Sequence, residues 1–150
     1  MNWASTDPKA LTEALHKAIP AFAAMQGEIT YIDDDTVRMT APLAPNKNVH
    51  GSGFAGSSMS LPSVAGWVIA QRMAFNLYGE RGITVLRSCS GDFSAPVNGQ
   101  FEIEASLVNQ EARRNGIAIE VQGSVKHGGH LCSSVSMLFR VLEQTLAEPV

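Results

Sequence analysis

A glycine-rich segment near the middle of the chain holds side chains that could take part in chemistry. It carries Asn48 and His50, and it leads through Gly56 into a helical pattern on which Ser63 lies. The free N–H groups and the dipole of a helix N-terminus attract negative charge. When water attacks a carbonyl carbon, the carbonyl oxygen gains such charge, so the segment predicts a site where an oxyanion can bind.

The same segment matches a nucleotide-binding pattern by its letters alone. Residues 51–56 fit G-x-G-x-x-G, but that motif follows a buried strand and belongs to a parallel sheet. Residues 45–48 are not a strand and only strands follow the helix, so we exclude a dinucleotide site. A metal site is not expected either, since His127 and His130 flank a surface turn without carboxylate or thiol neighbours. The sequence therefore predicts no cofactor.

Residues 57–78 are predicted to form one long helix, about 30 Å from end to end. One face is an apolar stripe suited to a core, and Arg72 on that face must pair or reach solvent. A second stripe is small and polar at its N-terminal end, which favours close packing against another subunit or ligand binding; a site at a dimer interface would combine both. The apolar stripe comprises Leu61, Val64, Ala65, Val68 and Phe75, and the second comprises Gly56, Ser60, Ser63 and Trp67.

The remaining segments predict a short helix and an antiparallel sheet. Asp7 and Pro8 begin the helix as its cap and first residue, and Pro20 ends it. Apolar residues at every second position indicate strands at residues 29–31, 37–41, 101–107 and 117–121. Residues 83–93 are expected to form the first strand after the long helix, and a mainly apolar run indicates a strand at 131–141. An antiparallel sheet wrapped around the long helix would bury it, so we expect a single α+β domain over residues 1–150.

Composition narrows the function classes. The 150 residues carry a net charge of −3, with a pI of about 5.7, so no basic surface is available for nucleic acid. The first residues show no secretory pattern, and Arg72 within the apolar stretch of residues 61–77 favours a buried helix over a membrane span. Cys89 and Cys132 are expected to be free thiols. We therefore expect a cytoplasmic protein.

Several motifs resemble the hotdog-fold thioesterase superfamily. Residues 48–56 (Asn-x-x-Gly-x-x-Phe-Ala-Gly) are similar to its Asn-x-x-Gly-x-x-His-Gly-Gly segment, and residues 92–99 resemble its strand that leads to a Pro-Val turn. The similarity is greatest to the branch known as the YiiD C-terminal-like domain. Its Ala-Pro-Leu-x-Pro-Asn, Phe-Gly-Gly-Ser and Ala-Gly-Trp motifs correspond to residues 41–46, 54–57 and 65–67. The resemblance covers nearly the whole chain and implies a hotdog fold, in which the sheet wraps a long central helix.

The resemblance also implies hydrolysis of an acyl thioester carried by coenzyme A or an acyl-carrier protein. In this interpretation the N–H of Gly56 holds the thioester oxygen. Asn48 and Ser63 orient the attacking water, and His50 accepts its proton. The residues expected to contact the substrate are Phe54, Ala55, Ser57, Ser60 and Trp67.

Two departures from the superfamily pattern keep other functions open. Phe54-Ala55 replaces His-Gly, and Ser63 stands where related thioesterases carry an acidic residue, so the usual carboxylate base is missing. A non-catalytic acyl-thioester-binding module is therefore one alternative. An acyl-thioester dehydratase or isomerase is another, although the helix has no acidic residue before Glu80. The open helix stripe and sheet edge predict a homodimer or a dimer of dimers.

Overall fold

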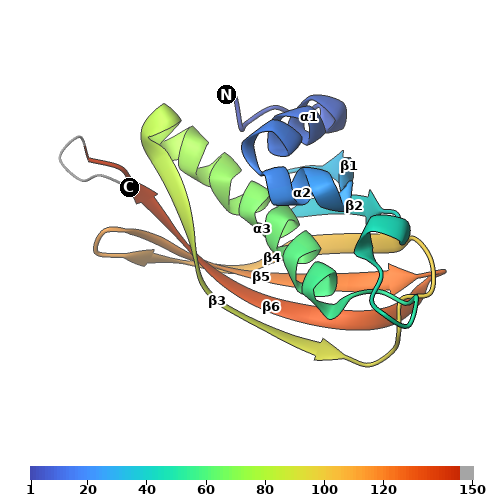
Figure 1. The fold of residues 1–150 in the computed structure, drawn as a ribbon. Helices are drawn as coiled ribbons and strands as arrows, with labels where there is room; N and C mark the ends of the chain where they lie inside the picture. Colours follow the sequence, from blue (N-terminus) through green and yellow to red (C-terminus); the bar gives the residue numbers. More distant parts are fainter. Residues whose placement is uncertain (146–150) are drawn as a thin grey trace.

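A six-stranded antiparallel sheet curves around one long helix (Figure 1). The computed structural model describes residues 1–145, and its sheet has the strand order β1-β2-β4-β5-β6-β3. This arrangement confirms the predicted α+β hotdog architecture. The elements are α1 (Pro8–Ala18), α2 (Pro20–Met25), β1 (Glu28–Ile32), β2 (Thr36–Ala41), η1 (Ala44–Asn46), α3 (Ala55–Tyr78), η2 (Gly79–Arg81), β3 (Gly82–Phe93), β4 (Phe101–Arg113), β5 (Gly116–His127) and β6 (His130–Glu143).

The N-terminal helix begins as predicted but is followed by a second helix that the sequence did not reveal. The Asp7 carboxylate accepts the N–H of Lys9 at 3.1 Å, and Pro8 is the first residue of α1. Pro20 ends α1 and also begins α2, because a residue without an N–H is well suited to a first helical turn. The six residues of α2 are too few to show a helical period, and fully buried Phe22 anchors them to the core.

The central helix α3 spans 24 residues and begins at Ala55, two positions before the predicted start. Leu61, Ala65 and Val68 of the predicted apolar stripe are at most 1% exposed, whereas Val64 and Phe75 are only partly buried. Arg72 pairs, as expected: it donates to the Ser5 carbonyl at 2.6 Å and to the Asp34 carboxylate at 3.2 Å. Most residues of α3 are buried or partly buried.

The two edges of the sheet are treated differently. At the β1 edge, Thr12 of α1 accepts the N–H of Ile29 at 2.9 Å, so a helix side chain satisfies an edge amide. At the opposite edge, β3 pairs with β6 on one side, and within residues 1–145 no strand pairs with its other side along its 12 residues. Cys89 on this strand and Cys132 on β6 are free thiols, as predicted. Among residues 1–145, no helix is both long and apolar enough to cross a bilayer.

Candidate active site

The loop before α3 is organised by the side chain of Asn48. Its Oδ1 accepts the N–H groups of His50 at 2.9 Å and Ser52 at 3.2 Å. Its Nδ2 donates to the Ser52 hydroxyl at 3.0 Å and to the Gly53 carbonyl at 3.2 Å. Gly51 turns the loop with a φ of +84°, a backbone conformation that favours glycine. Asn48 therefore holds the shape of the loop from inside it.

A second set of bonds fixes this loop to the body of the protein. The N–H of Gly53 donates to Val97, and that of Phe54 donates to Asn46, both at 2.7 Å. The hydroxyl of Ser57 donates to Oδ1 of Asn46 at 2.9 Å, and both residues are buried. Ser57 was predicted to contact substrate, but its hydroxyl is already engaged in the interior. Through this hydrogen bond to Asn46, Ser57 stabilises the start of α3.

The first turn of α3 presents free backbone N–H groups. Phe54 is the N-cap residue and offers no side-chain acceptor. The first amide to bond back along the chain is Ser58, whose N–H reaches the Phe54 carbonyl at 3.1 Å. The amides of Ala55 and Gly56 precede it and point out of the helix end, where the dipole is positive. The Phe54 ring is 54% exposed and packs beside Gly56, at the place that a Cβ on that residue would occupy.

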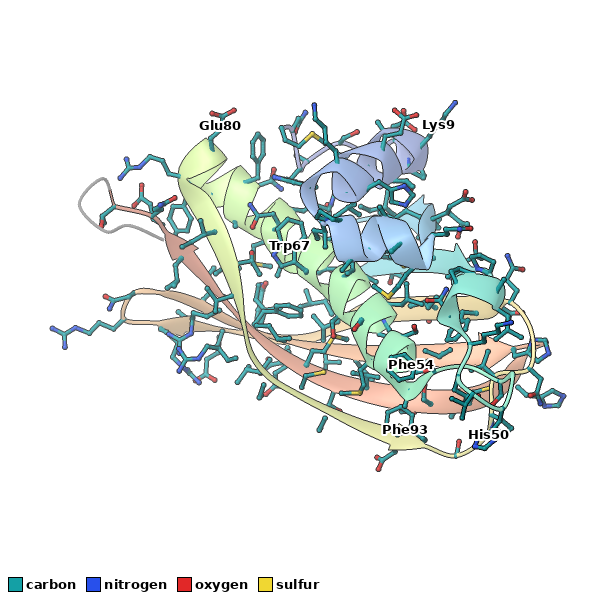
Figure 2. The ribbon with its side chains drawn as sticks, viewed as in Figure 1. Lys9, His50, Phe54, Trp67, Glu80 and Phe93 are labelled. Atoms are coloured by element: carbon teal, nitrogen blue, oxygen red, sulfur yellow. The ribbon has the colours of Figure 1, made fainter. Side chains whose placement is uncertain are left out.

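A cavity of about 340 Å³ opens beside this helix end. Asn48 and Ala55, both predicted site residues, line it. Sequence reasoning missed its other walls: Ser52, Gly53, Ser58, residues 93–97 and Ser133. Figure 2 shows His50, Phe54 and Phe93 gathered at this end of the molecule, with Glu80 at the far end of α3. The cavity thus lies where loop, helix and sheet meet.

The remaining predicted residues lie on a different surface. The Ser63 hydroxyl donates to the Met59 carbonyl at 2.7 Å and lies 3.7 Å from the sulfur of Cys89 on β3. Ser60 is exposed. Trp67 lies midway along α3 (Figure 2), where its ring stacks edge-on against Trp3 with centroids 5.0 Å apart. Within one chain, the structure does not bring these three residues to the cavity.

The sequence over most of the chain matches one family. Residues 8–136 match the model described as "Putative thioesterase (yiiD_Cterm)". The chain belongs to this thioesterase family. No curated protein sequence matches it.

Solved thioesterase structures share the fold of this family member. A thioesterase from Haemophilus influenzae superposes with a TM-score of 0.81 at 18% identity, covering 99% of this chain and 100% of the other. A structure described as a putative thioesterase from Shewanella oneidensis has a TM-score of 0.75 at 24% identity and covers 91% of this chain and 96% of its own. A mutant thioesterase from Pseudomonas aeruginosa has a TM-score of 0.73 at 12% identity, over 95% and 99% of the two chains. The predicted enzyme class is confirmed at the level of the family.

Within residues 1–145, the side chains that line the cavity are dipolar or apolar. None of the described residues that line it is ionisable. Its polar groups include serine hydroxyls, the Asn48 carboxamide and the free backbone amide of Ala55, whereas Gly56, the predicted oxyanion donor, follows Ala55 just outside the lining. Fixed dipoles of this kind can stabilise a developing oxyanion without reorganising during the reaction. His50 is exposed on the adjoining loop, outside the cavity lining.

Proposed function

We propose that this protein hydrolyses an acyl thioester by attack of water at the N-terminus of α3. The observation that carries the proposal is the uncapped start of that helix beside a cavity of about 340 Å³, in a chain of the thioesterase family. Free N–H groups at this position match the oxyanion that forms from a thioester carbonyl.

The reaction needs little from side chains. The water oxygen bonds to the acyl carbon, the carbon–sulfur bond breaks, and the thiolate takes up a proton, giving a carboxylic acid and a thiol. A thiol has a pKa of about 8.5, so it leaves without a strong acid. The step that most needs the protein is stabilisation of the oxyanion, and we assign this role to the N–H of Gly56, which donates to the thioester oxygen.

The other residues take supporting roles in this proposal. Asn48 holds both His50 and the Gly53 carbonyl, so it positions the loop from which His50 accepts a proton from water. Ala55 forms part of the acyl wall, and Phe54 covers the entrance beside Gly56. The carrier is coenzyme A or an acyl-carrier protein.

Ser63, which we expect to orient the attacking water, takes this role through contact with a second copy of the chain. Its contact with Cys89 places the stripe formed by Gly56, Ser60, Ser63 and Trp67 next to the open edge of β3. A homodimer, or a dimer of dimers, that pairs this edge would cover the stripe and place the two sites near the interface. The free thiols Cys89 and Cys132 support a reducing, cytoplasmic location.

The absence of an ionisable lining residue favours one second candidate, an acyl-thioester-binding module without turnover. Such a module would use the same cavity and helix end, because binding needs the dipoles but no proton acceptor. It differs from the enzyme in that the thioester remains intact after binding.

Hydrolysis of a panel of acyl-coenzyme A esters of increasing chain length tests the proposal. Loss of the ultraviolet absorbance of the thioester is the better readout, since Cys89 is partly accessible to thiol reagents. Turnover that falls in Asn48→Ala and Ser63→Ala would support hydrolysis and the assigned roles. Unchanged turnover in both variants would contradict the roles, and binding without cleavage across the panel would favour the module.

A further inference from the structure

The inner face of β6 carries a row of buried side chains that packs against α3. Val135, Met137, Phe139 and Val141 occupy alternate positions and are at most 3% exposed. Ser133 is the next residue in this row and is also buried, at 2% exposed. The row is therefore apolar along the body of the helix and becomes polar at the cavity, which Ser133 lines.

Within the described residues 1–145, the hydroxyl of Ser133 has no hydrogen-bond partner. Four buried side-chain atoms in residues 1–145 share this property, and only the Ser133 hydroxyl belongs to a residue of this cavity. Buried hydroxyls in folded proteins are nearly always bonded, and one that is not needs a reason. The hydroxyl oxygen is itself buried, so binding a ligand in the cavity requires a rotation between staggered positions, and this rotation breaks no hydrogen bond.

Ser133 has two apolar neighbours in the sheet and shares the cavity with a buried serine of α3. In the sheet, Ser133 pairs with Phe93 of β3 and Val125 of β5, so their side chains flank it. Ser58, in the first turn of α3, is 3% exposed and lines the same cavity. A volume of about 340 Å³ is near the lower end for small-molecule sites and is sufficient for a short acyl chain.

We infer that the Ser133 hydroxyl binds an oxygen carried by the acyl chain, so that the preferred substrates are short hydroxyacyl or oxoacyl thioesters. The inference rests on the proposed function in that it names the substrate class of the same cavity. A plain alkyl chain would leave the hydroxyl unbonded, whereas an oxygen on the acyl chain would satisfy it. Ser133 is thus a specificity-determining residue that takes no part in breaking the thioester.

Butyryl-coenzyme A and the two enantiomers of 3-hydroxybutyryl-coenzyme A form a matched test, since they differ by one oxygen. We expect the wild type to prefer a hydroxyacyl ester. In Ser133→Ala, the ratio of kcat/KM for that ester to kcat/KM for butyryl-coenzyme A should fall roughly 3- to 10-fold, the contribution of one hydrogen bond. The thermal midpoint of Ser133→Ala should stay the same or rise, because an unbonded hydroxyl has been removed.

Thr84→Val is the matched control. Thr84 of β3 has the same kind of buried, unpartnered hydroxyl but does not line the cavity. Its replacement should leave the selectivity ratio unchanged. The inference would be overturned if the wild type showed no preference for a hydroxyacyl ester, or if Ser133→Ala left the kcat/KM ratio unchanged. An equal loss of kcat/KM on both esters would also overturn it, because the hydroxyl would then contact the thioester group that both esters share.

Calorimetric binding of the same esters separates this inference from the proposed function. In one outcome, no ester is cleaved, 3-hydroxybutyryl-coenzyme A binds more tightly than butyryl-coenzyme A, and Ser133→Ala but not Thr84→Val removes this difference in affinity. The proposal of hydrolysis then fails and the inference about Ser133 stands. If both esters are cleaved at equal rates in the wild type and in Ser133→Ala, hydrolysis stands and the inference fails.

Discussion

The carboxamide of Asn48 uses its whole hydrogen-bonding capacity within one loop. A carboxamide has two N–H donors and two acceptor lone pairs, and all four are engaged, with His50, Ser52 and Gly53. Because its capacity is filled within the loop, we assign Asn48 a positional effect on the reaction in place of the predicted orienting of water, since it sets where the chain enters α3. Small displacements of such groups can cost a large part of the rate.

Replacing Asn48 by alanine should weaken both the loop and the activity. We expect the unfolding free energy to fall by about 1–2 kcal/mol and acyl-coenzyme A hydrolysis to fall about 10- to 100-fold. Denaturant unfolding and steady-state kinetics measure the two effects. Asn109→Ala, at an exposed position of β4, is the control and should change neither. A normal rate in a destabilised Asn48→Ala protein would separate loop structure from catalysis and contradict the positional role.

Ser57 offers a stability prediction at the neighbouring position. Ser57→Ala removes the donor to Oδ1 of Asn46, which is 1% exposed, and leaves that oxygen unpaired. The expected loss is about 1–3 kcal/mol of unfolding free energy. Ser60→Ala, at an exposed position of the same helix, should be neutral or slightly stabilising because alanine favours helix. Equal stability of the two variants would show that the Ser57–Asn46 bond does not hold the helix start.

At the scale of elements, the β1–β2 turn contains the clearest pH-sensitive group. The Asp33 carboxylate accepts the Tyr31 hydroxyl at 2.6 Å and the N–H groups of Asp35 at 2.8 Å and Thr36 at 2.7 Å. These bonds, led by that from Tyr31, lower the pKa of Asp33. A lowered pKa in the folded state means that the carboxylate stabilises the hairpin fully above its unfolded pKa. The contribution is lost as pH falls through the lower, folded value.

Acid should therefore weaken the chain partly through Asp33. Below about pH 4, where an unfolded aspartate takes up its proton, stability should fall with decreasing pH. In Asp33→Asn this part of the slope should disappear, and the variant should be less stable than the wild type at neutral pH. Urea titrations at several pH values measure the slope, with the exposed Asp92→Asn as control. An acid slope that is identical in Asp33→Asn and the wild type would contradict the assignment.

The elements that the sequence predicted are those with a strong local pattern. The α3 helix is long and apolar on most sides and several strands alternate, so periodicity predicted these elements, whereas β6 was predicted from a mainly apolar run. The short helix α2 has no period to detect, and it became a helix because Phe22 is buried in tertiary contacts. The cavity was only partly predicted, since Ser133 lies far along the chain from Asn48 and joins it through the pairing of β6 with β3. The one local sequence feature that could have indicated this wall of the cavity was Ser133, a serine at the end of the apolar row on β6.

At the scale of the whole molecule, the two sheet edges predict how copies of the chain associate. The β1 edge is protected by Thr12 of α1, so addition of another strand there would displace a helix. The β3 edge is long and open, and it carries partly exposed apolar residues: Val85 at 42%, Leu86 at 41% and Phe93 at 52%. An unprotected edge of this kind pairs readily with another strand. A two-fold axis across β3 would form a continuous sheet through both copies.

Charges placed on this edge should therefore separate the copies. In Val85→Lys/Leu86→Lys, like charges from two chains would meet across the two-fold axis, and we expect a monomer by light scattering where the wild type is a dimer or larger. Thr30→Lys, at an exposed position of β1 on the opposite edge of the sheet, adds charge away from β3 and should keep the wild-type mass. Because the stripe around Ser63 adjoins β3 through Cys89, the monomer should also lose thioester hydrolysis. A monomeric wild type, or a double variant that keeps the wild-type mass, would rule out assembly through β3.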